Sequence, residues 1–149
     1  MMKVSKEKLF LKSPGSTLWI RFLRFDRMTS RRLEENLGEL GLTLPQFHVL
    51  ATLGYTGSLA FNEIGQELMV TVGNLTGIVD RLEIKGLVTR RRDGKDRRIV
   101  MVSLTQEGEK LYHLASRVFD KTVVGLFRPL QGGQQKTLSR LLRLLTPRN

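Results

Sequence analysis

Apolar residues recur at helical spacing along most of the chain, and proline, glycine or hydroxyl residues stand where each run begins or ends. The first run starts after Ser13 and Pro14, a typical N-cap and first-turn pair, and Gly41 is a typical C′ residue. These signals predict a long helix that ends near Leu40. Its apolar positions are Leu18, Phe22, Phe25, Leu33, Leu37 and Leu40.

The second run begins at Thr43, a suitable N-cap, and has Pro45 in its first turn. Gly54 and Gly57 are expected to end this helix. Its predicted inward face consists of Phe47, Leu50, Ala51 and Leu53.

Two shorter helices joined by a turn are predicted next, over about residues 61–69 and 71–85. Thr71 is the expected N-cap of the second helix. The cap position of the first, Ala60, has no side-chain oxygen, so Ser58 must cap from further back or the helix end frays. Four apolar residues of the second helix fall at i, i+3, i+4 and i+7 and predict one buried stripe: Leu75, Ile78, Val79 and Leu82.

Two predicted strands follow, at residues 87–91 and 98–104, with Asp93-Gly94 as a turn between them. Alternation of three apolar positions with their neighbours predicts a hairpin with one buried face: Val100, Val102 and Leu104 against Ile99, Met101 and Ser103. A helix-turn-helix followed by a hairpin wing is a shape suited to duplex DNA.

Thr105 is expected to cap a long helix towards Phe127, which Pro129 ends. A leucine-rich helix is predicted over about residues 134–145, and Gly132-Gly133 weaken its start. Four apolar side chains of the long helix have little to pack against within one subunit: Phe119, Val123, Leu126 and Phe127. A two-fold homodimer would cover them, although the helices could also fold back as a monomeric bundle.

The expected fold class is mainly α with a small β-hairpin wing (α+β). We predict an N-terminal arm and dimerisation helix over residues 1–42, a winged helix-turn-helix over residues 43–105, and C-terminal dimerisation helices over residues 106–149. At 149 residues, these parts are expected to form one compact subunit.

Composition supports a polyanionic partner. The formal net charge is +11 and the pI is near 10.7, which favours nucleic acid or an anionic membrane surface, although charge can also serve solubility alone. The chain has no cysteine, which excludes disulfides, thiol redox sensing and cysteine-ligated zinc. With no apolar run of the ~20 residues that cross a bilayer and no signal-peptide pattern, we expect a cytoplasmic protein that does not enter a membrane.

The second helix of the motif carries a polar face suited to a major groove: Gly73, Asn74, Thr76, Gly77, Asp80 and Arg81. Asn74 can pair with adenine, and Thr76 can touch a phosphate or a thymine methyl. Gly73 and Gly77 allow close approach to DNA, or alternatively close packing against another helix. The helix start at Thr71 offers N–H groups to phosphate.

The predicted wing concentrates positive charge, with six Lys or Arg against two Asp between Leu87 and Arg98. Its cations are Arg90, Arg91, Arg92, Lys95, Arg97 and Arg98. An arginine at such a tip would reach a narrow A·T-rich minor groove, whereas a solvated hairpin is the alternative. Asp96 is expected to orient a nearby arginine by an ion pair.

Several motifs resemble those of the MarR family of winged-helix transcriptional regulators: LTLPQFHVL, NEIGQEL, VTVGNLTGIVDRLEIKGLVTR and DGKDRRIVMVSLTQEG. The resemblance covers residues 42–108 closely. It implies a homodimer on a pseudo-palindromic duplex site, most members being repressors, with Arg98 in the minor groove and Asp96 as its partner. Together with the residue patterns, it predicts these DNA-binding residues: Thr43, Thr71, Gly73, Asn74, Thr76, Gly77, Arg81, Lys95, Asp96, Arg97 and Arg98.

The same resemblance implies a small aromatic or phenolic effector that binds between the dimer helices and the winged lobe and releases DNA. Candidates to line its site are Trp19, Phe22, Phe47 and His48, and core packing is the alternative. No cofactor or metal is predicted.

Two other function classes compete. An enzyme is disfavoured because His48 and His113 belong to no nucleophile or metal motif, and Gly94-Lys95 lacks the glycine spacing of a phosphate loop. A non-specific architectural nucleic-acid-binding protein, or a membrane-surface module, would show charge without a reading helix.

Overall fold

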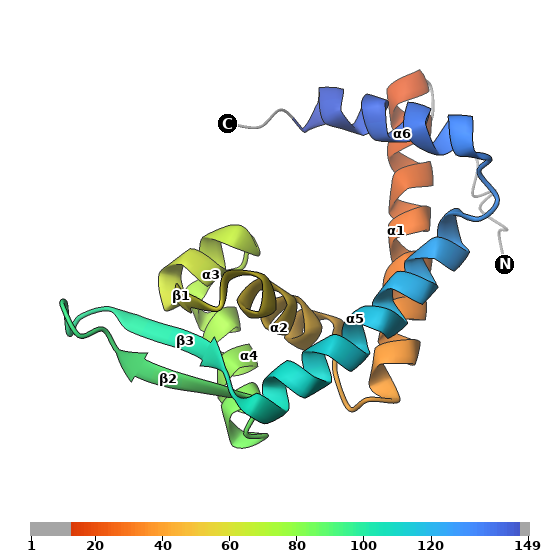
Figure 1. Ribbon diagram of the computed structural model, residues 1–149. Helices are drawn as coiled ribbons and strands as arrows, with labels where there is room; N and C mark the ends of the chain where they lie inside the picture. Colours follow the sequence, from red (N-terminus) through yellow and green to blue (C-terminus); the bar gives the residue numbers. More distant parts are fainter. Residues whose placement is uncertain (1–12, 147–149) are drawn as a thin grey trace, which may run out of the picture.

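The computed structural model describes residues 13–146, which form six helices and three strands (Figure 1). Residues of α1 to α5 and of the three strands share one apolar core, to which α6 contributes no residue. The N-terminal arm predicted before residue 13 lies outside the described residues. The elements are α1 (Pro14–Gly38), α2 (Leu44–Thr56), β1 (Ser58–Ala60), α3 (Phe61–Glu67), α4 (Val72–Ile84), β2 (Val88–Arg92), β3 (Val100–Leu104), α5 (Gln106–Phe127) and α6 (Gly132–Leu145).

All four predicted side-chain caps are present. The hydroxyls of Ser13, Thr43, Thr71 and Thr105 each accept a hydrogen bond from the backbone N–H three residues further on. At Thr43, Gln46 Oε1 also accepts from the Thr43 N–H at 3.1 Å, which completes a capping box. Local chemistry therefore determines where four of the helices begin.

The start of α3 differs from the prediction. Ser58 is not a cap, because residues 58–60 form a short strand, β1, that pairs antiparallel with β3 and makes a sheet of order β1-β3-β2. The Ser58 hydroxyl donates to Val102 O at 3.3 Å. The first turn of α3 is held instead by Glu63, whose Oε2 accepts from the Ala60 N–H at 3.0 Å.

Two further predictions were wrong, the helix end at Gly54 and the tight turn at Asp93-Gly94. Gly54 lies inside α2, where it faces the ring of Tyr112, and the helix ends at Gly57, which has a φ of +79°. The wing does not turn at Asp93-Gly94 alone. Residues 93–99 form a longer loop, in which Asp93 Oδ2 accepts from the backbone N–H groups of Lys95 and Asp96.

The predicted stripe of α4 is buried as expected and packs with residues of α1, α2, α3 and the sheet. Contrary to expectation, part of α5 finds partners within the subunit. Phe119 stacks on Phe47 with ring centroids 4.9 Å apart, and Phe127 packs on Phe25 at 5.4 Å. Asn36 Nδ2 also donates to the Thr122 hydroxyl at 2.7 Å, which joins α1 to α5.

The sheet is joined to α5 by a tight backbone contact. The Thr105 hydroxyl donates to Gly86 O at 2.6 Å, and the Thr105 N–H donates to Leu87 O at 3.1 Å. Gly108, in the first turn of α5, is buried directly against Leu87 O, and a Cβ there would overlap that oxygen. This contact positions the wing relative to the long helix that extends towards α1 (Figure 1).

Replacing Gly108 is expected to disrupt that junction. Because the obstacle is backbone, Gly108→Ala should lower the free energy of unfolding by about 1–3 kcal/mol, measured by urea denaturation. Gly125→Ala, in the same helix with no atom within 4 Å of the added Cβ, is the control and should be neutral or stabilising. Equal stability of the two variants would contradict the proposed close contact.

Candidate nucleic-acid interface

The outward face of α4 is bare and open. Its predicted polar residues are exposed, apart from the half-buried Gly77. A Cβ at Gly73 would meet nothing within 4 Å, and a Cβ at Gly77 would meet only the Arg81 guanidinium, from 3.5 Å. Among the described residues no helix packs on these glycines, so the packing alternative loses its support in this subunit.

The first turn of α4 presents several groups to solvent. Thr71 caps this turn, because its Oγ1 accepts a hydrogen bond from the Asn74 backbone N–H at 3.4 Å. The Asn74 side chain is exposed. The Thr76 hydroxyl donates to Val72 O at 2.8 Å. Free N–H groups of a first turn attract anions, so this end of α4 is compatible with a phosphate.

Asp96 and Arg98 form the ion pair expected at the wing. Arg98 Nη2 lies 2.9 Å from Asp96 Oδ2, and Arg98 Nε lies 3.0 Å from Asp96 Oδ1, a two-pronged contact. Asp96 Oδ1 also accepts from the Arg98 backbone N–H at 3.0 Å. Hydrogen bonds from Arg98 lower the pKa of the Asp96 carboxyl and raise the pKa of Arg98, so both stay charged near neutral pH.

Arg90 does not belong to the exposed basic surface, although its place in the sequence groups it with the wing cations. Its side chain is only 23% exposed and lies 2.6 Å from Asp80 and 2.8 Å from Glu83, both on α4. The Arg90 backbone N–H donates to Glu83 Oε1 at 3.2 Å, and its guanidinium lies over the Phe61 ring at 5.6 Å. Arg90 therefore ties β2 to α4 and α3.

The other wing cations divide by role. Arg92 Nη1 donates to Arg97 O at 2.7 Å and closes the loop from inside. The structure records no ion pair for Arg91, Lys95 or Arg97 within residues 13–146, and all three side chains are exposed. Positive charge at the wing is thus concentrated at its loop, which projects from the helices (Figure 1).

Thr43 lies apart from the wing. Its hydroxyl is engaged in capping α2, and that helix start contacts the C-terminal end of α4 through Lys85. Lys85 Nζ donates to Gly41 O at 2.6 Å and lies 3.5 Å from Gln46 Oε1. Thr43 therefore lies near the C-terminal end of α4, at the opposite end of that helix from Thr71.

This surface can be compared with known proteins. The MarR family matches residues 42–100. YfiV, an uncharacterized HTH-type transcriptional regulator of Bacillus subtilis, is 31% identical over 139 residues, which cover 92% of this chain and 76% of YfiV. The chain belongs to the MarR family.

Further similarities agree with this MarR-family membership. The HTH-type transcriptional repressor MdtR of Bacillus subtilis is 41% identical over 75 residues, 50% of this chain and 48% of MdtR. A crystal structure of a mutant MarR from E. coli, complexed with operator DNA, has a TM-score of 0.82 and 29% identity, covering 88% of this chain and 94% of that one. The winged helix-turn-helix described above is therefore that of a DNA-binding transcriptional regulator.

The four candidate effector residues differ in burial in this MarR-family subunit. Phe47 is buried in the core, in agreement with the core-packing alternative. Trp19 and Phe22 stack at 6.1 Å on α1 but are 60% and 51% exposed. His48 is exposed, and partial desolvation of its ring lowers its pKa and favours the neutral form.

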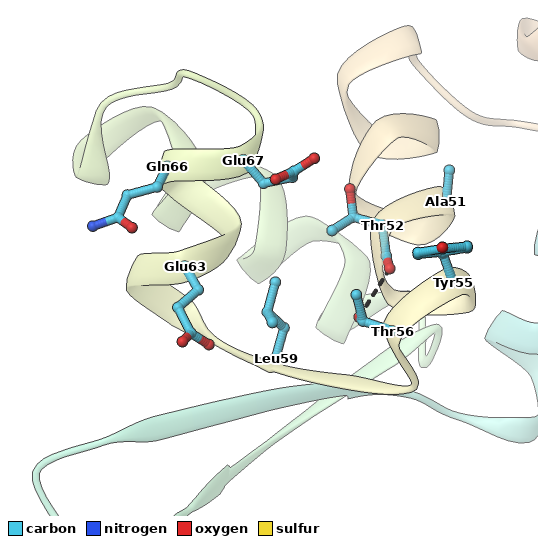
Figure 2. Close-up of a pocket in the computed structure, with 8 residues that line it drawn as sticks. All are labelled: Ala51, Thr52, Tyr55, Thr56, Leu59, Glu63, Gln66 and Glu67. Atoms are coloured by element: carbon cyan, nitrogen blue, oxygen red, sulfur yellow. Dashed lines mark hydrogen bonds between the residues drawn. The ribbon is translucent and has the colours of Figure 1, made fainter. Parts of the chain in front are cut away.

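A different hollow lies between α2, β1 and α3, with a volume of about 710 Å³ (Figure 2). Tyr55 and Thr52 stand on one side of it, and the carboxylates of Glu63 and Glu67 belong to the opposite helix. Carboxylates repel phosphate, so this flank marks a limit of any DNA-binding surface.

Within residues 13–146, no helix combines the length and apolarity needed to cross a bilayer. The same part of the chain gathers no group of three His, Asp or Glu side chains that could hold a metal ion.

Removing the Arg90 side-chain contacts is expected to loosen the wing. Arg90→Met should lower the free energy of unfolding by about 1–2 kcal/mol, because the ion pairs with Asp80 and Glu83 are lost. It should also speed hydrogen exchange of the β2 amides. The neighbouring, exposed Arg91→Met is the control and should stay within about 0.5 kcal/mol of the wild type. Unchanged β2 exchange in Arg90→Met would show that Arg90 does not hold the wing.

Proposed function

We propose that this MarR-family regulator is a repressor that binds, as a homodimer, a pseudo-palindromic site in double-stranded DNA. Helix α4, over about residues 71–85, would enter the major groove, and the wing, over about residues 87–104, would contact the adjacent minor groove. The observation that carries the proposal is the bare, exposed face of α4 beside an arginine that a carboxylate holds in one orientation.

The proposed major-groove contacts come from the exposed side of α4. Gly73 and Gly77 let the helix backbone approach the bases, and Asn74 would pair with a base edge. Arg81 lies back across Gly77, within reach of the same groove. The helix start at Thr71 would receive a phosphate.

The proposed wing contact centres on Arg98. Its pairing with Asp96 reduces the number of conformations that the side chain loses on entering a narrow groove. Lys95 and Arg97, exposed on the same loop, would contact phosphates.

Dimerisation is proposed because α1 and α6 expose apolar side chains that a single subunit leaves uncovered. No residue of α6 is buried. The exposed apolar residues of these two helices are Leu18, Trp19, Phe22, Met28, Leu141, Leu142, Leu144 and Leu145. A second copy would cover them and place two α4 helices on one duplex. The mutant MarR of E. coli was crystallised with operator DNA, and MdtR is named a repressor, which supports the same reading here.

A small aromatic or phenolic effector remains part of the proposal, with Trp19 and Phe22 as the candidates left exposed beside the dimer helices. A ligand there would act by favouring a spacing of the two α4 helices that does not fit DNA. We also infer a regulatory rather than an enzymatic protein, working in the cytoplasm. The competing function is non-specific architectural binding.

Selection of bound duplexes from a random pool, followed by sequencing, tests this function. The expected result is one symmetric sequence with two half-sites about one helical turn apart, as two α4 helices of a dimer require. At moderate salt this duplex should bind at least about a thousandfold more tightly than random duplex. Recovery of unrelated sequences with equal affinity would support the architectural binder instead.

Asp96→Asn tests the orienting role at the wing. Asparagine keeps an Oδ1 that can accept from the Arg98 N–H but loses the ion pair, so the loop should keep its fold while Arg98 becomes mobile. We expect about three- to tenfold weaker binding of the selected duplex in gel shifts, even though the protein gains positive charge. Asp120→Asn on α5 makes the same charge change at a distance and serves as the control. Tighter binding by Asp96→Asn than by this control would show that Asp96 merely repels DNA.

A further inference from the structure

Two exposed apolar side chains flank the start of α4. Met69, in the turn before the helix, is 94% exposed, and Val72, the first residue of α4, is 64% exposed. Neither belongs to the predicted DNA-binding set. Both sit at the end of the helix that inserts most deeply in a helix-turn-helix complex, because the first residues of such a helix contact base edges.

The backbone places Met69 in this position at a cost. Its φ is +51°, and it is the one non-glycine residue of the described chain with a positive φ. A turn of this kind favours glycine or asparagine, so a long apolar side chain here is held by the surrounding fold. It borders a hollow of about 450 Å³ that Val72 also lines, between α3 and the start of α4.

Thr76 extends the apolar edge by one turn. Since its hydroxyl donates to Val72 O at 2.8 Å, the proton that could reach a phosphate is already used. That hydrogen bond also holds the side chain in one rotamer and leaves the γ-methyl as its free group. Val72 and Thr76 stand four residues apart on α4, so they share one side of the helix.

We propose that Val72 and Thr76 contact the C5-methyl groups of thymines in the major groove and thereby specify thymine at those positions of the site. The thymine methyl is the one apolar group that a base pair presents there, and aliphatic side chains recognise it by burial. Met69 covers the outer side of the contact and excludes water from it. The inference rests on the proposed function, which states that the protein binds a specific duplex but not which apolar residues contact its thymines.

The test uses the full-length protein and the duplex selected from the random pool. Each thymine is replaced in turn by deoxyuridine, which removes the methyl and keeps the pairing edge. Wild-type protein should lose about fourfold in affinity at one or two positions in each half-site, the value expected for one buried methyl. Affinity for a random duplex at the same salt, measured in parallel, reports the intact fold and the phosphate contacts.

Matched variants assign the readers. Val72→Ala and Thr76→Ser should each bind the thymine duplex about three- to fivefold more weakly and show no further loss on deoxyuridine at the position they read. Thr76→Val keeps the methyl and removes the hydroxyl, so it should retain the wild-type preference for thymine. Each change should lower affinity for random duplex by much less than affinity for the thymine duplex, because most random sequences lack a thymine at the positions that are read.

Three results would overturn the inference while leaving the proposed function intact. The first is equal affinity of the wild-type protein for the thymine duplex and for every deoxyuridine duplex. The second is a loss of affinity on deoxyuridine that persists unchanged in Val72→Ala and Thr76→Ser. The third is weaker binding of the thymine duplex by Thr76→Val but unchanged binding by Thr76→Ser. The last would identify the Thr76 hydroxyl as a phosphate contact. Failure to select any duplex would overturn the proposed function, and this inference with it.

Discussion

Burial of the α4 stripe is the constraint on which the rest of the structure depends. Leu75, Val79 and Leu82 are completely inaccessible and Ile78 nearly so, and full burial of such side chains stabilises a fold by about 1.5–3 kcal/mol each. Burial of one side of a helix fixes its rotation about its own axis and therefore determines which residues face outward. Gly73 and Gly77 are therefore held outward by the core behind them, and with them the whole polar face.

The position of the wing is linked to the same helix. Arg90 joins β2 to two carboxylates of α4, and Gly108 lets α5 approach Leu87 closely enough to anchor the other end of the hairpin. A wing loop at a defined distance from α4 needs both contacts. Because α5 also packs on α1, through Phe127 on Phe25 and the hydrogen bond from Asn36 to Thr122, a change in the angle of the long helices would be transmitted to the wing.

Most of the helical fold could be predicted because its signals are local. A hydroxyl three residues before a free N–H, or a glycine at a positive φ such as Gly41 and Gly86, can be recognised in a short window. β1 could not, because three residues carry no periodicity and its pairing depends on Ser103, far along the chain. The separation of Arg90 from its basic neighbours likewise needed the distance to Asp80, although two acids on one side of the predicted helix were a usable signal. The exposure of Val72 and the positive φ of Met69 depend on the backbone path of the turn between α3 and α4, which no local sequence signal indicates.

Acidic residues beside a surface for DNA weaken its attraction, so their presence here needs a reason. Asp80 and Glu83 each contact Arg90, and Asp96 contacts Arg98. The two arginines differ in what remains free: Arg90 is largely enclosed, with an aromatic ring beneath it, whereas 91% of the Arg98 side chain stays exposed. Asp80 and Glu83 thus give Arg90 a structural role, whereas the single carboxylate of Asp96 orients Arg98, which remains available to a partner. The formal charge of +11 favours binding to a polyanion. The positions of these three acids determine which cations remain free to contact it.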